Sequence, residues 1–199
     1  MSKLQHEAII AEAMRLIERD GEAALSMRTL ATGLGVTPMA LYRYFANRDE
    51  LLLALVDRVS RTIEFPEPTG DPVDSAVDLA LCLHDFLADH PWMIRLISSG
   101  RLASPAGLTF PEGFIACAHR AGHTDDEAFI FYRTMFATIL GTATITNAKR
   151  ESGPAHLPDP AAAEQVPLVT KLAPRWAELD ATATPAAILR AAAQTLTIA

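Results

Sequence analysis

Donor groups suited to nucleic acid gather in one stretch of the sequence that has no acidic residue. This stretch runs from residue 27 to residue 48. Its arginines and tyrosines are Arg28, Tyr42, Arg43, Tyr44 and Arg48. Guanidinium and phenol groups donate hydrogen bonds to phosphate oxygens, and arginine also reads base edges. The stretch therefore carries the donors that a nucleic-acid-binding surface needs.

The charge of the whole chain argues against nucleic acid only when it is taken as an average. The 199 residues include 17 basic and 24 acidic ones, which gives a formal net charge of −7. The stretch from residue 27 to 48 carries three positive charges and no negative one, so the acidity lies elsewhere. Charges more than about 10 Å away are largely screened at ~0.1 M salt, so a local basic surface can still meet phosphates.

Cys117, His119 and His123 resemble a set of metal ligands, because the two histidines are four residues apart. Gly122 and Thr124 indicate that a helix ends between the two histidines, and no adjacent carboxylate completes a ligand set. We therefore expect no metal site.

Catalytic motifs are also missing from the sequence. It has no Gly-x-Ser-x-Gly, no phosphate-binding glycine loop and no His-Glu-x-x-His. Asp71, Asp74 and Asp78 have helical spacing, but acids are favoured in the first turn of a helix and on a solvated face. We expect no enzyme activity, no catalytic residue and no cofactor.

The arginine-rich stretch must be positioned by short helices. We predict a helix at 5–19, a second from the N-cap Ser26 to Gly35, a third from Thr37-Pro38 to about residue 44, and a longer one capped by Asn47. The apolar residues that would pack the second helix on the third are Leu30, Ala31, Leu34, Val36, Leu41 and Phe45. Two helices joined by a short glycine-containing turn can place the second in the major groove of DNA.

This stretch resembles the TetR family of bacterial transcription repressors over about residues 5–57. The matching residues are Leu30-Ala31, Leu34-Gly35-Val36-Thr37-Pro38, Leu41-Tyr42-Arg43-Tyr44-Phe45 and Asn47-Arg48-Asp49-Glu50-Leu51-Leu52. The family often has His before the Phe and Lys after the Asn, where this chain has Tyr44 and Arg48, both of which keep a donor. The later residues match only in length and helical character.

The resemblance implies roles for eight residues. The recognition helix would carry Thr37, Pro38, Met39, Tyr42 and Arg43. Thr37 and Arg43 would bond base edges or phosphate, while Pro38 and Met39 would touch thymine methyl groups. The better phosphate ligands would be Arg28, Tyr42, Tyr44 and Arg48. Alternatives stay open: Tyr42 as a packing residue, Met39 as an ordinary exposed side chain and Arg48 as a solvated charge.

Three prolines and a glycine between Phe65 and Pro72 mark the best domain boundary. We predict an all-α protein with two domains: a three-helix helix-turn-helix domain with its connecting helix at 1–64, and a helical ligand-binding and dimerisation domain at 65–199. Further helices are expected near 73–89, 91–99, 111–121, 124–149, 164–179 and 185–198.

The small number of cysteines and the first residues of the chain indicate the cellular compartment. Two cysteines, Cys82 and Cys117, make no disulfide framework, and the first residues lack a signal-peptide layout. Residues 128–148 hold a single charge, Arg133, and are long enough to span a bilayer. Their five threonines and the acidic residues before them favour a helix buried in protein. We expect a cytoplasmic protein with no membrane span.

The resemblance further implies a homodimer that binds a palindromic double-stranded DNA operator and is released by a small-molecule effector, hydrophobic or aromatic in nature. The candidate ligand-binding residues are Phe86, Trp92, Phe114, Cys117, Phe129, Tyr132, Arg133 and Phe136. Helical aromatic residues of this kind are also common in plain cores. For dimerisation we favour the helix at 128–148, with threonines every four residues, together with the last helix. Packing within one chain is the alternative for these faces.

Two other functions stay open at this point. The helix-turn-helix could be only a packing unit in a helical small-molecule-binding or protein-interaction module that does not bind DNA. Within the DNA-binding class, the protein could act as an activator.

Overall fold

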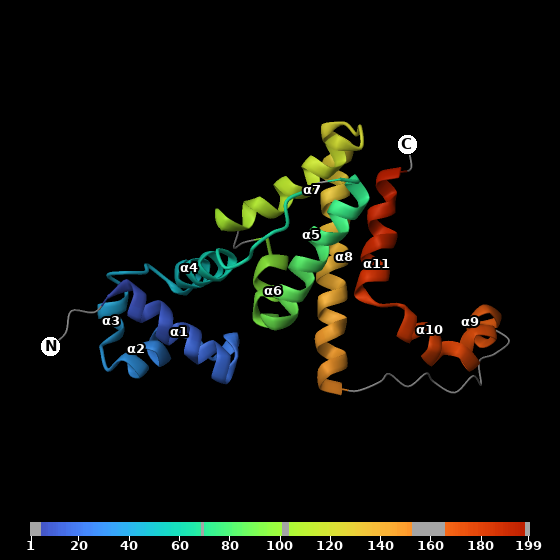
Figure 1. The fold of residues 1–199 in the computed structure, drawn as a ribbon. Helices are drawn as coiled ribbons and strands as arrows, with labels where there is room; N and C mark the ends of the chain where they lie inside the picture. The colour runs from blue at the N-terminus through green and yellow to red at the C-terminus, as the bar shows by residue number, and fades with distance from the viewer. Residues whose placement is uncertain (1–4, 69, 101–103, 153–165, 198–199) are drawn as a thin grey trace. The chain divides into compact units, whose positions relative to one another are not determined.

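The computed structural model describes residues 5–68, 70–100, 104–152 and 166–197 (Figure 1). Every regular element in these ranges is helical, which confirms the predicted all-α class. The N-terminal helices are α1 (His6–Asp20), η1 (Glu22–Ala24), α2 (Met27–Leu34), α3 (Pro38–Leu41) and α4 (Arg48–Ser60). The later ones are α5 (Pro72–Asp89), α6 (Pro91–Ser98), η2 (Ala106–Leu108), α7 (Thr109–Arg120), α8 (Asp125–Ser152), α9 (Pro167–Leu172), η4 (Ala173–Arg175), α10 (Trp176–Thr182), α11 (Pro185–Ala193) and η5 (Gln194–Thr197).

The chain divides into two compact units, each of which combines two separate segments of the sequence. Unit 1 consists of Met1–Glu64 and His90–Pro111, and unit 2 consists of Phe65–Asp89 and Glu112–Ala199. Helix α6 belongs to unit 1 because Trp92 and Leu96 pack against the core of the N-terminal helices.

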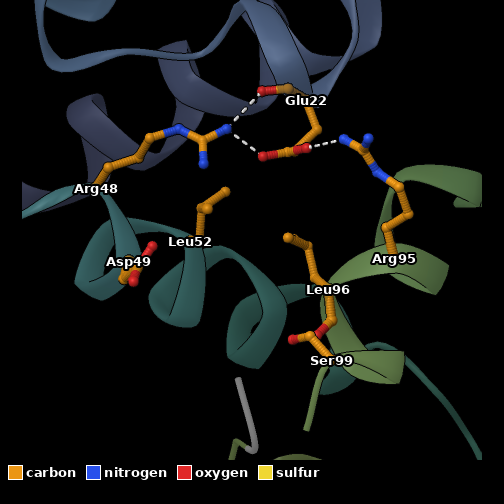
Figure 2. A pocket seen from close by; sticks show the side chains of 7 residues that line it. All are labelled: Glu22, Arg48, Asp49, Leu52, Arg95, Leu96 and Ser99. Carbon is orange, nitrogen blue, oxygen red and sulfur yellow. Dashed lines mark hydrogen bonds and ion pairs between the residues drawn. The ribbon is translucent and has the colours of Figure 1, made fainter. Parts of the chain in front are cut away.

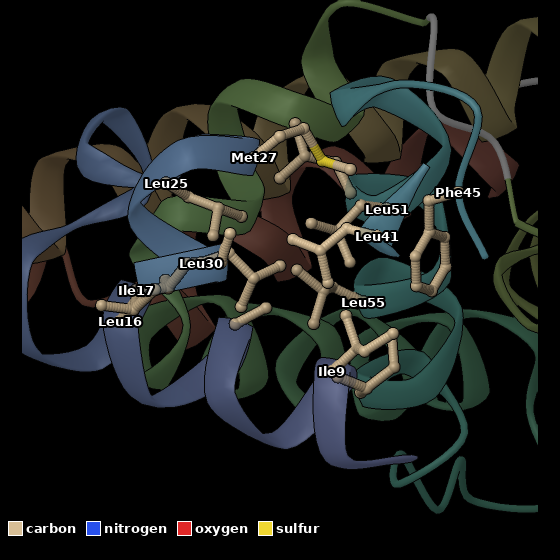
Figure 3. Close-up of a cluster of buried hydrophobic side chains, with 14 residues drawn as sticks. Ile9, Leu16, Ile17, Leu25, Met27, Leu30, Leu41, Phe45, Leu51 and Leu55 are labelled. Atoms are coloured by element: carbon tan, nitrogen blue, oxygen red, sulfur yellow. The ribbon is translucent and has the colours of Figure 1, made fainter. Parts of the chain in front are cut away.

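The core of unit 1 gathers apolar side chains from each of its first four α-helices (Figure 3). Ile9, Leu30, Leu41 and Leu51 are fully buried representatives from α1, α2, α3 and α4. Burying each such side chain contributes roughly 1.5–3 kcal/mol before the entropy cost of ordering it. This core fixes the short helix α3, which is too brief to be stable alone.

Two helix starts of unit 1 have the predicted side-chain caps. The Ser26 hydroxyl accepts a hydrogen bond from the Thr29 amide at 3.0 Å, and the Asn47 carbonyl oxygen accepts one from the Glu50 amide at 2.9 Å. Gly35 ends α2 with φ +65°, a left-handed conformation that costs glycine little. The third helix is shorter than predicted: α3 ends at Leu41, and a turn follows.

Unit 2 is built on α5, which packs against α8 and α11 (Figure 1). Leu83, Met135, Ile139 and Leu189 are buried in this layer. His84 lies among them with only 3% of its surface exposed, and its Nε2 lies 3.2 Å from the Thr146 hydroxyl of α8.

Helix α8 is only partly covered within one chain. By length and composition alone it could cross a membrane, but such a helix is weak evidence for a span. Only 33% of its most apolar 18-residue window is buried. The expectation of a helix buried in protein therefore holds for the face toward α5 and α11, and the opposite face is exposed.

The helix predicted at 164–179 is broken in the structure, and its first two residues lie outside the described ranges. Pro174 separates α9 from α10 with the short 3₁₀ turn η4. A proline inside a helix removes an amide donor and its ring clashes with a carbonyl of the preceding turn.

Candidate functional site

The exposed surface of unit 1 around α3 is made of residues singled out in the sequence. Pro38 is the first residue of α3, where its missing amide hydrogen is not needed. Met39 and Tyr42 are 73% and 47% exposed, and Arg43 is exposed beside them in sequence. Thr37 occupies the N-cap, but its hydroxyl makes no cap hydrogen bond and stays available to a ligand.

Most described arginines of unit 1 form an ion pair with a nearby carboxylate, and two of them share one. The pairs are Arg15–Glu12, Arg19–Asp20, Arg48–Glu22, Arg58–Glu7, Arg61–Asp57 and Arg95–Glu22. Within the described part of unit 1, the Arg28 and Arg43 side chains alone among the arginines have neither an ion pair nor a hydrogen bond. Both are exposed. Within the described residues of unit 1, the arginine side chains without a carboxylate partner therefore lie on α2 and just after α3.

Arg48 has a different environment from the one predicted. Its Nε donates a hydrogen bond to the Leu25 carbonyl at 2.7 Å, and its Nη2 donates to the carbonyl and to the carboxylate of Glu22. The guanidinium is thus engaged with η1 and the chain that follows it. Tyr44 is half-buried and packs against the unit 1 core.

Glu22 is the residue that sequence reasoning missed. It is 7% exposed, and its carboxylate accepts hydrogen bonds from Arg48 of α4 and from Arg95 of α6. Burial acts to raise the pKa of Glu22, but the two guanidinium groups outweigh it and hold that pKa below its ordinary value. Its partners are 26 and 73 residues away in the sequence, so no local pattern indicates the cluster.

A cavity of about 300 Å³ opens beside this ion-pair cluster (Figure 2). Its lining residues are Glu22, Arg48, Asp49, Leu52, Arg95, Leu96 and Ser99. Because its two guanidinium groups already share one carboxylate, the cluster ties η1, α4 and α6 together within unit 1.

The eight candidate ligand-binding residues do not form one group. Phe114 and Cys117 are fully buried on α7, and Phe114 lies 6.0 Å from Phe131 between ring centroids. Burial raises the pKa of the Cys117 thiol, which disfavours the reactive thiolate. Phe86 is half-buried on α5, whereas Trp92 belongs to unit 1.

The other four candidates form an outward cluster on α8. Ring centroids of Tyr132 lie 5.9 Å from Phe129 and 6.0 Å from Phe136. The Arg133 guanidinium carbon lies 5.9 and 5.7 Å from the Tyr132 and Phe136 centroids, within cation–π range. Phe129 is 56% exposed, so this cluster is a surface feature of the single chain.

The histidines near the end of α7 contact carboxylates instead of each other. His119 Nε2 lies 3.0 Å from Asp125, and His123 Nδ1 lies 3.7 Å from Glu127. Among the residues that the structure describes, no group of three or more potential ligands could hold a metal ion.

Comparisons with known proteins place the N-terminal helices in a known group. Residues 9–55 match the family model for bacterial regulatory proteins, tetR family. The HTH-type transcriptional repressor DrrR1 of Streptomyces coeruleorubidus is 32% identical over 124 residues, which cover 61% of this chain and 46% of the repressor. The chain spans about half the length of the curated relatives it matches first.

Solved structures share the fold of the described helices. BioQ, crystallised with its natural double-stranded DNA operator, is 28% identical with a TM-score of 0.64, covering 76% of this chain and 90% of BioQ. ActR of Streptomyces coelicolor, in complex with (S)-DNPA, is 23% identical with a TM-score of 0.70, covering 98% of this chain and 99% of ActR. The latter likeness concerns the fold alone.

Proposed function

The chain belongs to the TetR family of bacterial regulatory proteins through its N-terminal helix-turn-helix domain, and from that premise we propose that it is a DNA-binding transcriptional regulator. The observation that carries the proposal is the distribution of charge in unit 1. Arg28 and Arg43 are free for phosphate or bases, while the other described arginines of this unit are paired with acids. BioQ, which shares the fold, was crystallised on its DNA operator.

Each exposed residue around α3 has a role in this proposal. Arg43 donates to a guanine edge or to phosphate, and the Thr37 hydroxyl bonds a base edge or phosphate. Pro38 and Met39 supply apolar contacts to thymine methyl groups. Arg28, in the first turn of α2, and Tyr42 bind phosphates and set the orientation on the duplex.

We further propose that the regulator is a homodimer formed through α8 and α11. Ala137 and Gly141 are exposed near the middle of α8, and a Cβ added at Gly141 would meet nothing within 4 Å in its own chain. Ile188 is 38% exposed on α11. Small residues let helices approach closely, and a two-headed protein matches half-sites about 34–36 Å apart on a palindromic operator.

The response to a small effector belongs to unit 2 in this proposal. ActR shares the fold, and its structure holds the small molecule (S)-DNPA, so such a fold accommodates a small molecule. A hydrophobic or aromatic effector suits the aromatic residues of α5, α7 and α8. Its differential affinity for two arrangements of the dimer would release the operator, so the protein would act as a repressor. The cytoplasm is the proposed location.

Fluorescence anisotropy with labelled duplexes tests DNA binding directly. The probes are the region upstream of the protein's own gene and a random duplex of equal length. Wild-type protein is expected to bind the first more tightly, and Arg28→Ala/Arg43→Ala is expected to bind neither. The matched control is Arg19→Ala, which removes an exposed arginine already paired with Asp20. Binding unaffected by the double variant, or equally lost in the control, would refute the proposed interface.

A further inference from the structure

The chain passes between the two units three times. These crossings fall between Glu64 and Phe65, between Asp89 and His90, and between Pro111 and Glu112. The first crossing lies in the linker that joins α4 to α5, which we define as residues 61–71. Residues 63–68 of the linker belong to no helix or turn, so their conformation depends on contacts with other elements.

One side chain of unit 2 holds the second half of the linker. Arg120, the last residue of α7, donates a hydrogen bond from Nη1 to the Pro68 carbonyl at 2.6 Å and another from Nη2 to the Gly70 carbonyl. The same Nη1 lies 3.5 Å from the hydroxyl of Ser75, a buried residue of α5. Hydrogen bonds from a guanidinium are charge-assisted and stronger than those between neutral groups. We call the bonds from Arg120 to Pro68 and Gly70 the linker clamp.

The other end of α7 is connected to the helix from which the linker starts. Helix α7 begins in unit 1 and ends in unit 2. The turn η2 leads directly into α7 and contacts α4. Within η2, the Ala106 amide donates a hydrogen bond to the Asp57 carboxylate of α4 at 3.2 Å. Asp57 lies about one turn before the end of α4 at Ser60.

These contacts close a loop of the chain. From Asp57 the chain runs through the end of α4 and the linker to Pro68, Arg120 joins Pro68 to α7, and α7 leads back through η2 to Asp57. Helix α7 has 12 residues and is a rod about 18 Å long. A loop that is closed through a rigid element has fewer arrangements than an open chain. The linker clamp therefore restricts how the end of α4 can move.

The direction of α4 determines where the helix-turn-helix lies. Leu51 and Leu55 of α4 are fully buried in the core that holds α1, α2 and α3 (Figure 3). Helix α4 has 13 residues and is about 20 Å long. A tilt of about 10° moves its far end by about 3.4 Å, which is the rise of one base pair. Small rotations at the linker thus become base-pair steps at the helices that we propose to contact DNA.

We propose that Arg120 is a positioning residue that determines which half-site spacing the dimer accepts. The inference rests on the proposed function, a dimeric regulator on a palindromic operator. With the linker clamp closed, both copies hold α4 in a narrow range of directions, and one distance between half-sites fits. With the clamp open, α4 tilts more freely and the dimer tolerates several distances. Arg120 does not need to touch DNA for this role.

Proteolysis of the linker tests the clamp without DNA. A Glu-specific protease cuts after Glu64, an exposed residue of the linker. Arg120→Met keeps a long side chain and removes every donor, so it is expected to raise the rate of this cleavage by about fivefold or more. Arg175→Met is the matched control, because it removes an arginine of unit 2 that pairs with Glu178 three residues away.

Three duplexes test the effect on spacing. They are the protected segment of the region upstream of the protein's own gene, the same segment with one base pair inserted at its centre, and a duplex with a single half-site. The insertion separates the half-sites by about 3.4 Å and rotates them by about 35°. Wild-type protein is expected to prefer the uninserted segment. Arg120→Met is expected to lower that preference by about fivefold or more, with half-site binding unchanged.

Two further variants separate positioning from folding. Arg120→Lys keeps a charged donor and is expected to recover part of the preference. Asp57→Ala opens the same closed loop at its other end, and Arg61→Ala, which removes only the ion pair with Asp57, is its control. Because both sites close one loop, Asp57→Ala/Arg120→Met is expected to lower the preference no further than either single variant. Additive losses would contradict the closed loop.

Each other outcome overturns the proposal in a distinguishable way. Unchanged cleavage in Arg120→Met means that Arg120 does not hold the linker. Faster cleavage with an unchanged preference means that spacing is determined elsewhere. Equal loss of affinity for all three duplexes leaves Arg120 a role in folding only. Wild-type protein that binds no duplex refutes the proposed function and with it the spacing role, whereas the cleavage rates still decide whether the clamp exists.

Discussion

Arg95 of α6 donates a hydrogen bond to the Glu22 carboxylate at 2.6 Å, although 73 residues separate them in the sequence. The same carboxylate accepts from Arg48 at the start of α4. One buried acid therefore joins the segment before α2 to α4 and to α6. The helices that we propose to contact DNA are thus held by a charge cluster that does not itself need to touch DNA.

Arg48→Ala is expected to act on stability more than on DNA affinity. Removing the guanidinium leaves the buried Glu22 carboxylate short of a donor, which costs about 1–3 kcal/mol. Arg95→Ala should cost less than about 1 kcal/mol because the Arg95 side chain is 73% exposed. Urea denaturation of both variants checks the order. Unchanged stability in Arg48→Ala, with lost DNA binding, would restore the phosphate role predicted from the sequence.

The Glu22 cluster also predicts how the stability of unit 1 depends on pH. The pKa of Glu22 lies below the ordinary value of 4.5, so its stabilising contribution is complete above that value. The contribution disappears as the pH falls through the lower pKa of the folded state. Thermal unfolding of wild type and Glu22→Gln should therefore differ by a constant amount from about pH 7 to 5 and converge in more acidic buffer. A difference that widens on acidification would contradict the assignment.

Truncating Arg43 and truncating Arg28 are expected to weaken DNA binding in different ways. Arg43→Ala should weaken binding to the specific duplex by about 5- to 150-fold and binding to random DNA much less, if it bonds a guanine edge. Arg28→Ala should weaken both by similar factors because phosphate contacts are independent of sequence. Titrations of both duplexes at one salt concentration separate the two roles. Equal losses for Arg43→Ala would reassign it to phosphate.

Gly141 provides a test of the proposed dimer face. A Cβ at Gly141 meets nothing within 4 Å in its own chain, whereas the leucine of Gly141→Leu would hold two α8 helices apart. We expect at least a tenfold rise in the dimer dissociation constant, with the helical content unchanged by circular dichroism. Ala121→Leu, an exposed site just after α7, is the matched control. A Gly141→Leu protein that dimerises like wild type would exclude this face.

Local sequence signals were sufficient to predict where the helices of unit 1 begin. Ser26, Asn47 and Pro38 each act on a helix start within four residues of themselves, so their effect is readable from the order of residues. Pro174 carries an equally local signal, yet the helix predicted at 164–179 runs through it.

The features that could not be predicted from the sequence depend on contacts between residues that are far apart in the chain. A basic residue next to Asn47 looks the same whether it faces DNA or a carboxylate contributed from 26 residues earlier. Trp92 likewise has the composition of a pocket residue, yet its helix packs on the N-terminal core. Outward and inward aromatic residues of α8 cannot be told apart until its neighbours α5 and α11 are in place.

The uncovered face of α8 has a consequence for how much of the protein a cell keeps. If the proposed homodimer forms, a newly synthesised chain displays this face until it finds a second copy, and exposed apolar surface is what chaperones and proteases bind. Because the rate of pairing grows with the square of the chain concentration, scarce chains would be degraded before they pair and abundant ones would be protected. The steady-state amount of regulator would then respond more steeply than linearly to its rate of synthesis.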